Sequence, residues 1–143
     1  MKILIANDHA AVDLKMEVKA YLEGLGHEII DVGAMEKKSC HYPEIGARAG
    51  RMVAAGEADC GVLMCGTGAG IAMAANKIRG VRAVACSEPV TARLAKEHNH
   101  ANIIAFGERI IGVEMAKAIL DAWLNAECLE GRHQLRADML DAL

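Results

Sequence analysis

The stretch that decides the fold is residues 60–70, CGVLMCGTGAG, where a short apolar run stops at Cys65 and a glycine-rich turn follows. An apolar run of this length, bounded by turn residues, is typical of a strand that is buried on both faces. A helix over residues 70–77 is expected to begin where the turn ends. A strand, a turn and a helix in this order form the repeating unit of a parallel α/β sheet.

The same order of strand and helix recurs along the whole chain. We expect strands at residues 2–6, 27–33, 60–65, 81–86 and 101–106, helices at residues 12–25, 43–56, 70–77, 89–98 and 112–126, and a last helix after Gly131. These units predict an α/β fold, a Rossmann-like three-layer sandwich in which a five-stranded parallel sheet has helices on both faces. Because the 143 residues contain no linker or internal repeat, we expect residues 1–143 to form one domain.

Composition and charge exclude several classes of partner. The net charge is −3, and acidic and basic residues are interspersed, so no nucleic-acid partner is expected. No uncharged run reaches the roughly 20 apolar residues that a membrane span needs, and no membrane partner is expected. The N-terminal MKILIANDHA lacks the core of a signal peptide, and the five widely spaced cysteines contain no CxxC pair. We therefore expect a cytoplasmic protein with reduced thiols.

Ligands of doubly wound sheets bind beyond the carboxyl ends of the strands. Polar and reactive residues gather at that edge of the predicted sheet. They are Asn7, Asp8 and His9, then Gly33, Cys65 to Gly68, Ser87 and Glu88, and Gly107 to Arg109. This edge is the predicted functional site.

The glycine turn 66–70 is suited to binding an anion rather than a dinucleotide. It lacks the GxGxxG spacing and follows the third strand instead of the first. Amides at a helix N-terminus bind an anion or a developing oxyanion. Cys65 precedes these amides, and a thiol at a helix start tends toward the thiolate, which is a nucleophile or a proton-abstracting base. The alternative is a small apolar residue that closes a strand.

Histidines and an aspartate supply further candidates for proton transfer. Asp8 and His98 could handle hydroxyl protons, and His9 could help to hold a phosphate; the alternative for Asp8 and His9 is a helix cap and a surface histidine. His98 could be an acid, or a solvated imidazole at a helix end. A zinc site is not expected, because Cys40, His41, His98 and His100 match no known ligand spacing. A redox pair is not expected either, because the odd spacing of Cys60 and Cys65 places them on opposite faces of a strand.

Arginines supply candidates for binding a phosphate group. Arg132 and Arg136 are four residues apart and share one face of the last helix, where they would form a phosphate clamp or a solvated basic patch. Arg109 is a third cation at the predicted ligand edge. Together with Cys65, these residues predict an aldose–ketose isomerase that acts on a small phosphorylated sugar without a metal or redox cofactor. A non-catalytic phosphate-binding module is the alternative.

The chain resembles the ribose-5-phosphate isomerase type B family along essentially its whole length. The matching motifs are NDHA (7–10), YP (42–43), CGTGAGIAMAANKIRGVRA (65–83), SEPVTARLAKEHN (87–99), FGERIIG (106–112) and GRHQLR (131–136). The broader group includes galactose-6-phosphate and allose-6-phosphate isomerases. The resemblance implies interconversion of ribose 5-phosphate and ribulose 5-phosphate in the pentose phosphate pathway. It also implies a Rossmann-like homodimer, in some members a tetramer, with sites at the subunit interface.

The resemblance also implies roles for individual residues. Cys65 would be the base that moves a proton between C1 and C2, with Thr67 assisting, and His98 the acid that opens the sugar ring. Asp8 would act at the ring oxygen and hydroxyls. Substrate and phosphate would be bound by Asp8, His9, Tyr42, Gly66, Thr67, Gly68, Ala69, Gly70, Asn99, Arg109, Arg132 and Arg136. Ile71 stands where another branch of the family has a glutamate base, so the chain resembles the cysteine branch.

The chain departs from the family pattern at a few positions near these motifs. Ala11 and Val12 replace a glycine and an aromatic residue, His41 replaces an acid, and His100 replaces an aspartate. Ala11 adds a methyl group that we expect near the phosphate end of the site. These departures leave the sugar open: allose 6-phosphate, galactose 6-phosphate and a tetrose phosphate are alternatives to ribose 5-phosphate.

Overall fold

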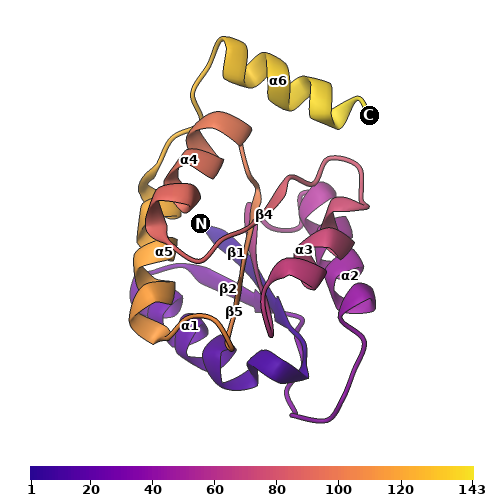
Figure 1. The fold of residues 1–143 in the computed structure, drawn as a ribbon, viewed down its shortest axis with the longest axis vertical. Coiled ribbons are helices and arrows are strands. Elements are labelled where there is room, and N and C mark those ends of the chain that lie inside the picture. Colours follow the sequence, from indigo (N-terminus) through magenta and orange to yellow (C-terminus); the bar gives the residue numbers. More distant parts are fainter.

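The computed structural model describes residues 1–143 and contains a parallel sheet between two layers of helices (Figure 1). The strands are β1 (Lys2–Asn7), β2 (Glu28–Asp31), β3 (Cys60–Cys65), β4 (Ala83–Ala85) and β5 (Ile103–Gly107). The helices are the 3-10 helix η1 (His9–Ala11), α1 (Val12–Gly24), α2 (Tyr42–Ala54), α3 (Ala69–Asn76), α4 (Pro89–Asn99), α5 (Val113–Asn125) and α6 (Arg132–Asp141). The strand order is β2-β1-β3-β5-β4, which confirms the predicted α/β sandwich.

Every predicted element is present, and only the ends differ. β2 and β4 are the strands that differ most from the prediction, and β2 ends at Asp31 instead of continuing to Gly33. The Asp31 carboxylate accepts a hydrogen bond from the Gly33 amide at 3.0 Å, so the chain turns there. β4 is likewise limited to Ala83–Ala85. The last helix begins directly after Gly131, as the sequence predicts.

The two faces of the sheet carry separate apolar cores. Ile3 and Ile5 of β1 pack on the side of α1, α4 and α5, together with the fully buried Trp123. Leu4 of β1 packs on the other side with α2 and α3. Side chains of a strand alternate between faces, which is why both cores draw on the same strands. Cys60 and Cys65 belong to different cores, which confirms the prediction from their spacing.

α6 crosses the amino-terminal edge of the sheet and contacts the end of α4 (Figure 1). Arg82, which precedes β4, donates from Nη1 to both carboxylate oxygens of Asp141 at 2.6 and 2.7 Å. Within α6 only Ala137 is buried, whereas Leu135 and Met139 are each 61% exposed. The helix therefore presents apolar side chains that this chain does not cover. No helix is long and apolar enough to cross a membrane.

The turn between β3 and α3 packs backbone to backbone against the end of β5. Gly68 has a left-handed φ of +86°, and a Cβ placed on it would lie 2.7 Å from the Phe106 Cα. A Cβ on Gly107 would overlap the carbonyl oxygen of Gly66 and the backbone of Thr67. Only glycine allows this approach, because it lacks a Cβ and tolerates positive φ.

We predict that Gly68→Ala destabilises the fold by about 3 kcal/mol or more, since it adds a clash to a strained φ. Gly24→Ala is the matched control, because Gly24 ends α1 with nothing within 4 Å of the added methyl group. It should change stability by no more than about 1 kcal/mol. Urea unfolding followed by circular dichroism, at one protein concentration, measures both. Equal stability of the two variants would contradict the packing described.

Candidate active site

A cavity of about 300 Å³ opens at the carboxyl ends of β1, β3 and β5. It is lined by Asp8, His9, Ala10, Tyr42, Cys65, Gly66, Thr67, Gly70 and Arg109. The sheet thus brings together residues from four separate parts of the sequence at the edge where the strand ends predict a site. All of them except Ala10 are residues that the sequence singles out.

Cys65 ends β3 at the base of this cavity and is 5% exposed. The Gly68 amide donates a hydrogen bond to its Sγ at 3.1 Å. Thr67 follows within the turn, and its Oγ1 accepts from the Ala69 amide at 3.2 Å. The Cys65 sulfur is thus held at the cavity by a backbone donor from the start of α3, in a position from which it can face a bound ligand.

Two other cysteines provide a contrast to Cys65. Burial raises the pKa of Cys60 to about 11 and that of Cys86 to about 11. Both therefore remain protonated near neutral pH and are unreactive there. Neither lines the cavity. All five cysteines of the chain are free.

Asp8 and His9 form a tight turn directly after β1. The Asp8 Oδ1 accepts from the Ala10 amide at 2.9 Å and so caps η1, while the Asp8 amide donates to the Met64 carbonyl at 3.1 Å. Asp8 is therefore a helix cap that also lines the cavity. His9 faces the cavity as well, and its Nδ1 accepts from the Cys40 amide at 3.2 Å.

Arg109 and Tyr42 form walls of the cavity and rest on glycines of the turn. A Cβ on Gly66 would lie 3.2 Å from the Arg109 Nη1, and one on Gly70 would lie 2.7 Å from the Tyr42 ring. The Arg109 amide also donates to the Gly66 carbonyl at 3.0 Å. The Arg109 guanidinium beside the turn that begins α3 gives this side of the cavity an anion-binding character.

Six predicted site residues do not line this cavity. Gly68 and Ala69 belong to the turn beside it, whereas His98, Asn99, Arg132 and Arg136 lie elsewhere. His98 lies at the end of α4 and stacks on His133, with ring centroids 4.5 Å apart and planes at 5°. Asn99 lines a larger cavity, of about 700 Å³, together with Arg82 and Asp141.

These residues belong to the opposite, amino-terminal edge of the sheet, beneath and along α6 (Figure 1). One chain therefore carries two groups of predicted site residues at opposite edges. The predicted topology already implies this separation, because a helix that follows a strand of a parallel sheet runs back to the other edge, so the end of α4 lies away from Cys65.

The residues that depart from the family pattern do not line the Cys65 cavity. Ala11 is fully buried in the core, so its methyl group packs there and does not line the cavity. His41 is exposed before α2, and His100 is buried with its Nε2 donating to the Leu129 carbonyl at 2.6 Å. Cys40, which precedes His41 in the chain, contacts the His9 side chain through its Sγ. No three His, Cys, Asp or Glu side chains form a group that could hold a metal ion.

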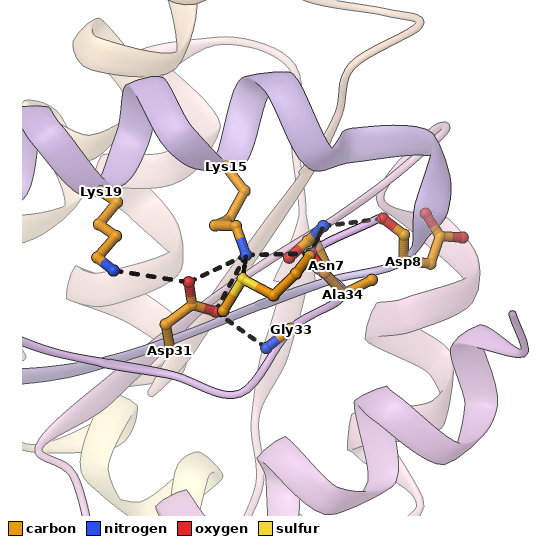
Figure 2. A network of polar contacts seen from close by, with 8 residues as sticks. Asn7, Asp8, Lys15, Lys19, Asp31, Gly33 and Ala34 are labelled. Atoms are coloured by element: carbon orange, nitrogen blue, oxygen red, sulfur yellow. Dashed lines mark hydrogen bonds and ion pairs between the residues drawn. The ribbon is translucent and has the colours of Figure 1, made fainter. Parts of the chain in front are cut away.

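The sequence analysis misses a polar network behind the Asp8–His9 turn (Figure 2). It is centred on Lys15 of α1, whose Nζ lies 3.0 Å from the Asp31 Oδ2. The signal was present in the sequence: Lys15 lies three and seven residues before Val18 and Leu22, on the helix face that we expect to be buried.

Comparison with known proteins identifies the family. Residues 3–140 match the family model described as Ribose/Galactose Isomerase. The chain belongs to this family. Ribose-5-phosphate isomerase B of Escherichia coli (strain K12) is 46% identical over 142 residues, which cover 99% of this chain and 95% of that protein. Galactose-6-phosphate isomerase subunit LacB of Clostridium acetobutylicum is 46% identical over 127 residues, which cover 89% of this chain and 73% of that protein.

A solved structure of this ribose/galactose isomerase family has the same fold along nearly its whole length. Ribose-5-phosphate isomerase B of Clostridium thermocellum superposes with a TM-score of 0.97 at 44% identity, covering 99% of this chain and 96% of that one. Membership of the family and the Rossmann-like sandwich predicted from the motifs are therefore both confirmed.

We predict that acid loosens α6. Burial, followed by the charges of His98, Arg132 and Arg136, lowers the pKa of His133 below its ordinary 6.5. A lowered histidine pKa contributes stability that is present above 6.5 and lost as pH falls through the folded value. Amide hydrogen exchange in α6, corrected for intrinsic rates, should therefore accelerate between about pH 7.5 and about pH 5.5. A His133→Gln variant should lose this dependence, and an unchanged dependence there would contradict the assignment to His133.

Proposed function

We propose that this protein is an aldose–ketose isomerase that interconverts ribose 5-phosphate and ribulose 5-phosphate. The observation that carries the proposal is the Cys65 sulfur at the base of the strand-end cavity, held by the Gly68 amide at 3.1 Å and accompanied by Asp8, His9 and Arg109. The names of the relatives described above support the same activity. A phosphate-binding module without catalysis would not need a thiolate at this place.

The proposed chemical step is a proton transfer through an enediolate. The Cys65 thiolate removes the proton from C2 of the open-chain aldose, and the electron pair moves so that the C1 oxygen becomes an oxyanion. Arg109, together with amides of the 66–70 turn that have no acceptor within the chain, stabilises that charge, since the first N–H groups of a helix lack intrahelical partners. Thr67 assists transfer of the hydroxyl proton from O2 to O1. Cys65 then returns its proton to C1, which leaves the ketone at C2.

Ring opening precedes this step and involves the residues at the other edge of the sheet. We propose that His98 protonates the ring oxygen while Asp8 takes the proton of the anomeric hydroxyl. Asn99, Arg132 and Arg136 bind the substrate, with the two arginines, together with Arg109, neutralising the phosphate. The mechanism requires no metal or other cofactor.

We propose that the site is completed by a second copy of the chain in a homodimer, from which a tetramer could assemble. Cys65 and His98 lie at opposite edges of one chain, and α6 exposes Leu135 and Met139 beside Arg132 and Arg136. Docking of that α6 face on a partner would bury its apolar side chains and bring its arginines to the partner's Cys65 cavity.

The proposed setting is a single isomerase domain over residues 1–143 in the cytoplasm, where its free cysteines stay reduced and the reaction serves the pentose phosphate pathway. Allose 6-phosphate, galactose 6-phosphate and a tetrose phosphate are the alternative substrates, because they need the same proton transfer in a cavity of different length.

We predict that Cys65→Ala lowers kcat by about 10³-fold or more, since it removes the general base, and leaves the fold intact. Cys60→Ala is the matched control, because this buried cysteine lies on the same strand in the opposite core. The assay follows ribose, allose, galactose and erythrose phosphates in the presence of EDTA. If only another sugar phosphate is converted, the proposed substrate changes and the proposed mechanism stands. Full activity of Cys65→Ala would rule out Cys65 as the base.

We predict that two inactive variants restore activity when they are mixed. Cys65→Ala and His98→Asn each inactivate one contribution to a shared site, so a mixed dimer holds one site with both native residues. After unfolding and refolding together, the mixture should recover about one quarter of native activity, because half of the dimers are mixed and half of their sites are intact. No recovery, with mixed dimers shown by mass spectrometry, would contradict sharing of the site.

A further inference from the structure

A fully buried lysine lies behind the Asp8–His9 turn. Lys15 projects from α1 with a side chain that is 0% exposed, and its Nζ lies 3.0 Å from Oδ2 and 3.2 Å from Oδ1 of Asp31, which is 7% exposed (Figure 2). A charge removed from water is costly unless it is paired and hydrogen-bonded. The other polar contacts of the Lys15 ammonium all go to one short segment of the chain. They indicate that the ion pair holds this segment in place.

That segment is the start of the loop between β2 and α2. The Lys15 Nζ donates to the Ala34 carbonyl at 3.1 Å and approaches the Met35 sulfur at 3.6 Å. Asp31 also holds this segment, since its Oδ1 accepts a hydrogen bond from the Gly33 amide at 3.0 Å. The ion pair therefore fixes residues 33–35 through both of its members.

Residues 33–35 in turn hold the end of β1. The Ala34 amide donates to the Asn7 carbonyl at 2.9 Å, and the Ala34 carbonyl accepts from the Asn7 Nδ2 at 3.1 Å. The same Nδ2 donates to the Asp8 carbonyl at 2.9 Å (Figure 2). Gly33 lies so close that a Cβ there would overlap the Asn7 side chain. The loop thus sets the position of the Asn7 amide, and the amide sets the turn at Asp8.

The far end of the same loop reaches His9. The Cys40 amide donates to the His9 Nδ1 at 3.2 Å, so this nitrogen is an acceptor. In a neutral imidazole with Nδ1 as acceptor, the proton resides on Nε2, which is then the donor available to a ligand. Loop 33–40 therefore contacts both members of the Asp8–His9 pair, one through Asn7 and the other directly.

We propose that Lys15, paired with Asp31, is a positioning residue for the Asp8–His9 pair. It acts through loop 33–40 and Asn7, which together orient the Asp8 turn and select the His9 tautomer with the proton on Nε2. Lys15 contacts no substrate, since it does not line the Cys65 cavity. The inference rests on the proposed function for its kinetic consequence, whereas the consequence for His9 is independent of any activity.

Lys15→Met tests the proposal, with Lys19→Met as the matched control. Lys19 lies one turn later on α1, 3.9 Å from the same Asp31 carboxylate, and its side chain is 34% exposed. No hydrogen bond or ion pair joins Lys19 to loop 33–40 (Figure 2). With ribose 5-phosphate, Lys15→Met should lower kcat/KM about 10- to 100-fold, as expected when catalytic groups are misplaced, and Lys19→Met should change it less than about two-fold.

Nitrogen NMR of His9 supplies a readout that general destabilisation would not move. The His9 signals are assigned by their loss in a His9→Gln variant. The native protein and Lys19→Met should show a single Nε2–H tautomer, and Lys15→Met a mixture. The alkylation rate of Cys65 by iodoacetamide, followed on its peptide by mass spectrometry, should stay within about two-fold of native, since the polar partners of Lys15 are Asp31, Ala34 and Met35 and none belongs to the β3–α3 turn.

Native His9 signals and native kcat/KM in a folded Lys15→Met protein would overturn the proposal. Equal losses in both lysine variants, or a loss of Cys65 alkylation that parallels the loss of kcat/KM, would overturn it as well.

If Lys15→Met fails to fold, Asn7→Ala takes its place, because it removes the link between Ala34 and Asp8 without leaving a buried charge. Native His9 signals and kcat/KM in Asn7→Ala would then overturn it. If the native protein converts no sugar phosphate, the proposed function is wrong. The His9 signals would still show whether Lys15 positions His9.

Discussion

The close approach of the glycine turn to the end of β5 is the constraint on which the site depends. Gly68 meets Phe106 and Gly107 meets the backbone of Gly66 and Thr67, with no room for a Cβ at either position. This contact holds the turn where the Gly68 amide reaches the Cys65 sulfur and where the chain after β5 delivers Arg109. A wider separation would leave the thiol without its donor and the amides without a cation beside them.

The direction of a parallel sheet explains why one chain carries an incomplete set of the residues proposed for catalysis. Every strand ends at the same edge, so residues after strands gather there, whereas residues at the ends of helices return to the opposite edge. His98 and Asn99 end α4, and the arginines of α6 follow a connection across that edge. A fold of this kind can unite both groups only by association, for which the exposed apolar face of α6 is suited.

The Lys15–Asp31 pair shows how this fold uses a buried charge. Replacing such a pair by apolar residues is often neutral or stabilising, so its presence is poor evidence for stability. Here the Lys15 ammonium, the Asp31 carboxylate and the Asn7 side-chain amide form hydrogen bonds with the backbone of one loop. Removing one partner would leave the other charge buried and unpaired, which costs about 3–5 kcal/mol of folding free energy. The buried pair therefore lies directly beside the turn that carries Asp8 and His9, where it orders the backbone.

The sequence by itself determined the elements, their order and the edge of the sheet at which Cys65, Asp8, His9 and Arg109 meet. It could do so because apolar periodicity, glycine turns and the chirality of crossover connections are local or general properties. It did not reveal that β2 stops at Asp31, since that end depends on a side-chain hydrogen bond. Only the packing of distant segments decided that His133 of α6 stacks on His98 and that Lys15 holds loop 33–40. These contacts join segments far apart in the chain, and they depend on how side chains pack rather than on any spacing in the sequence.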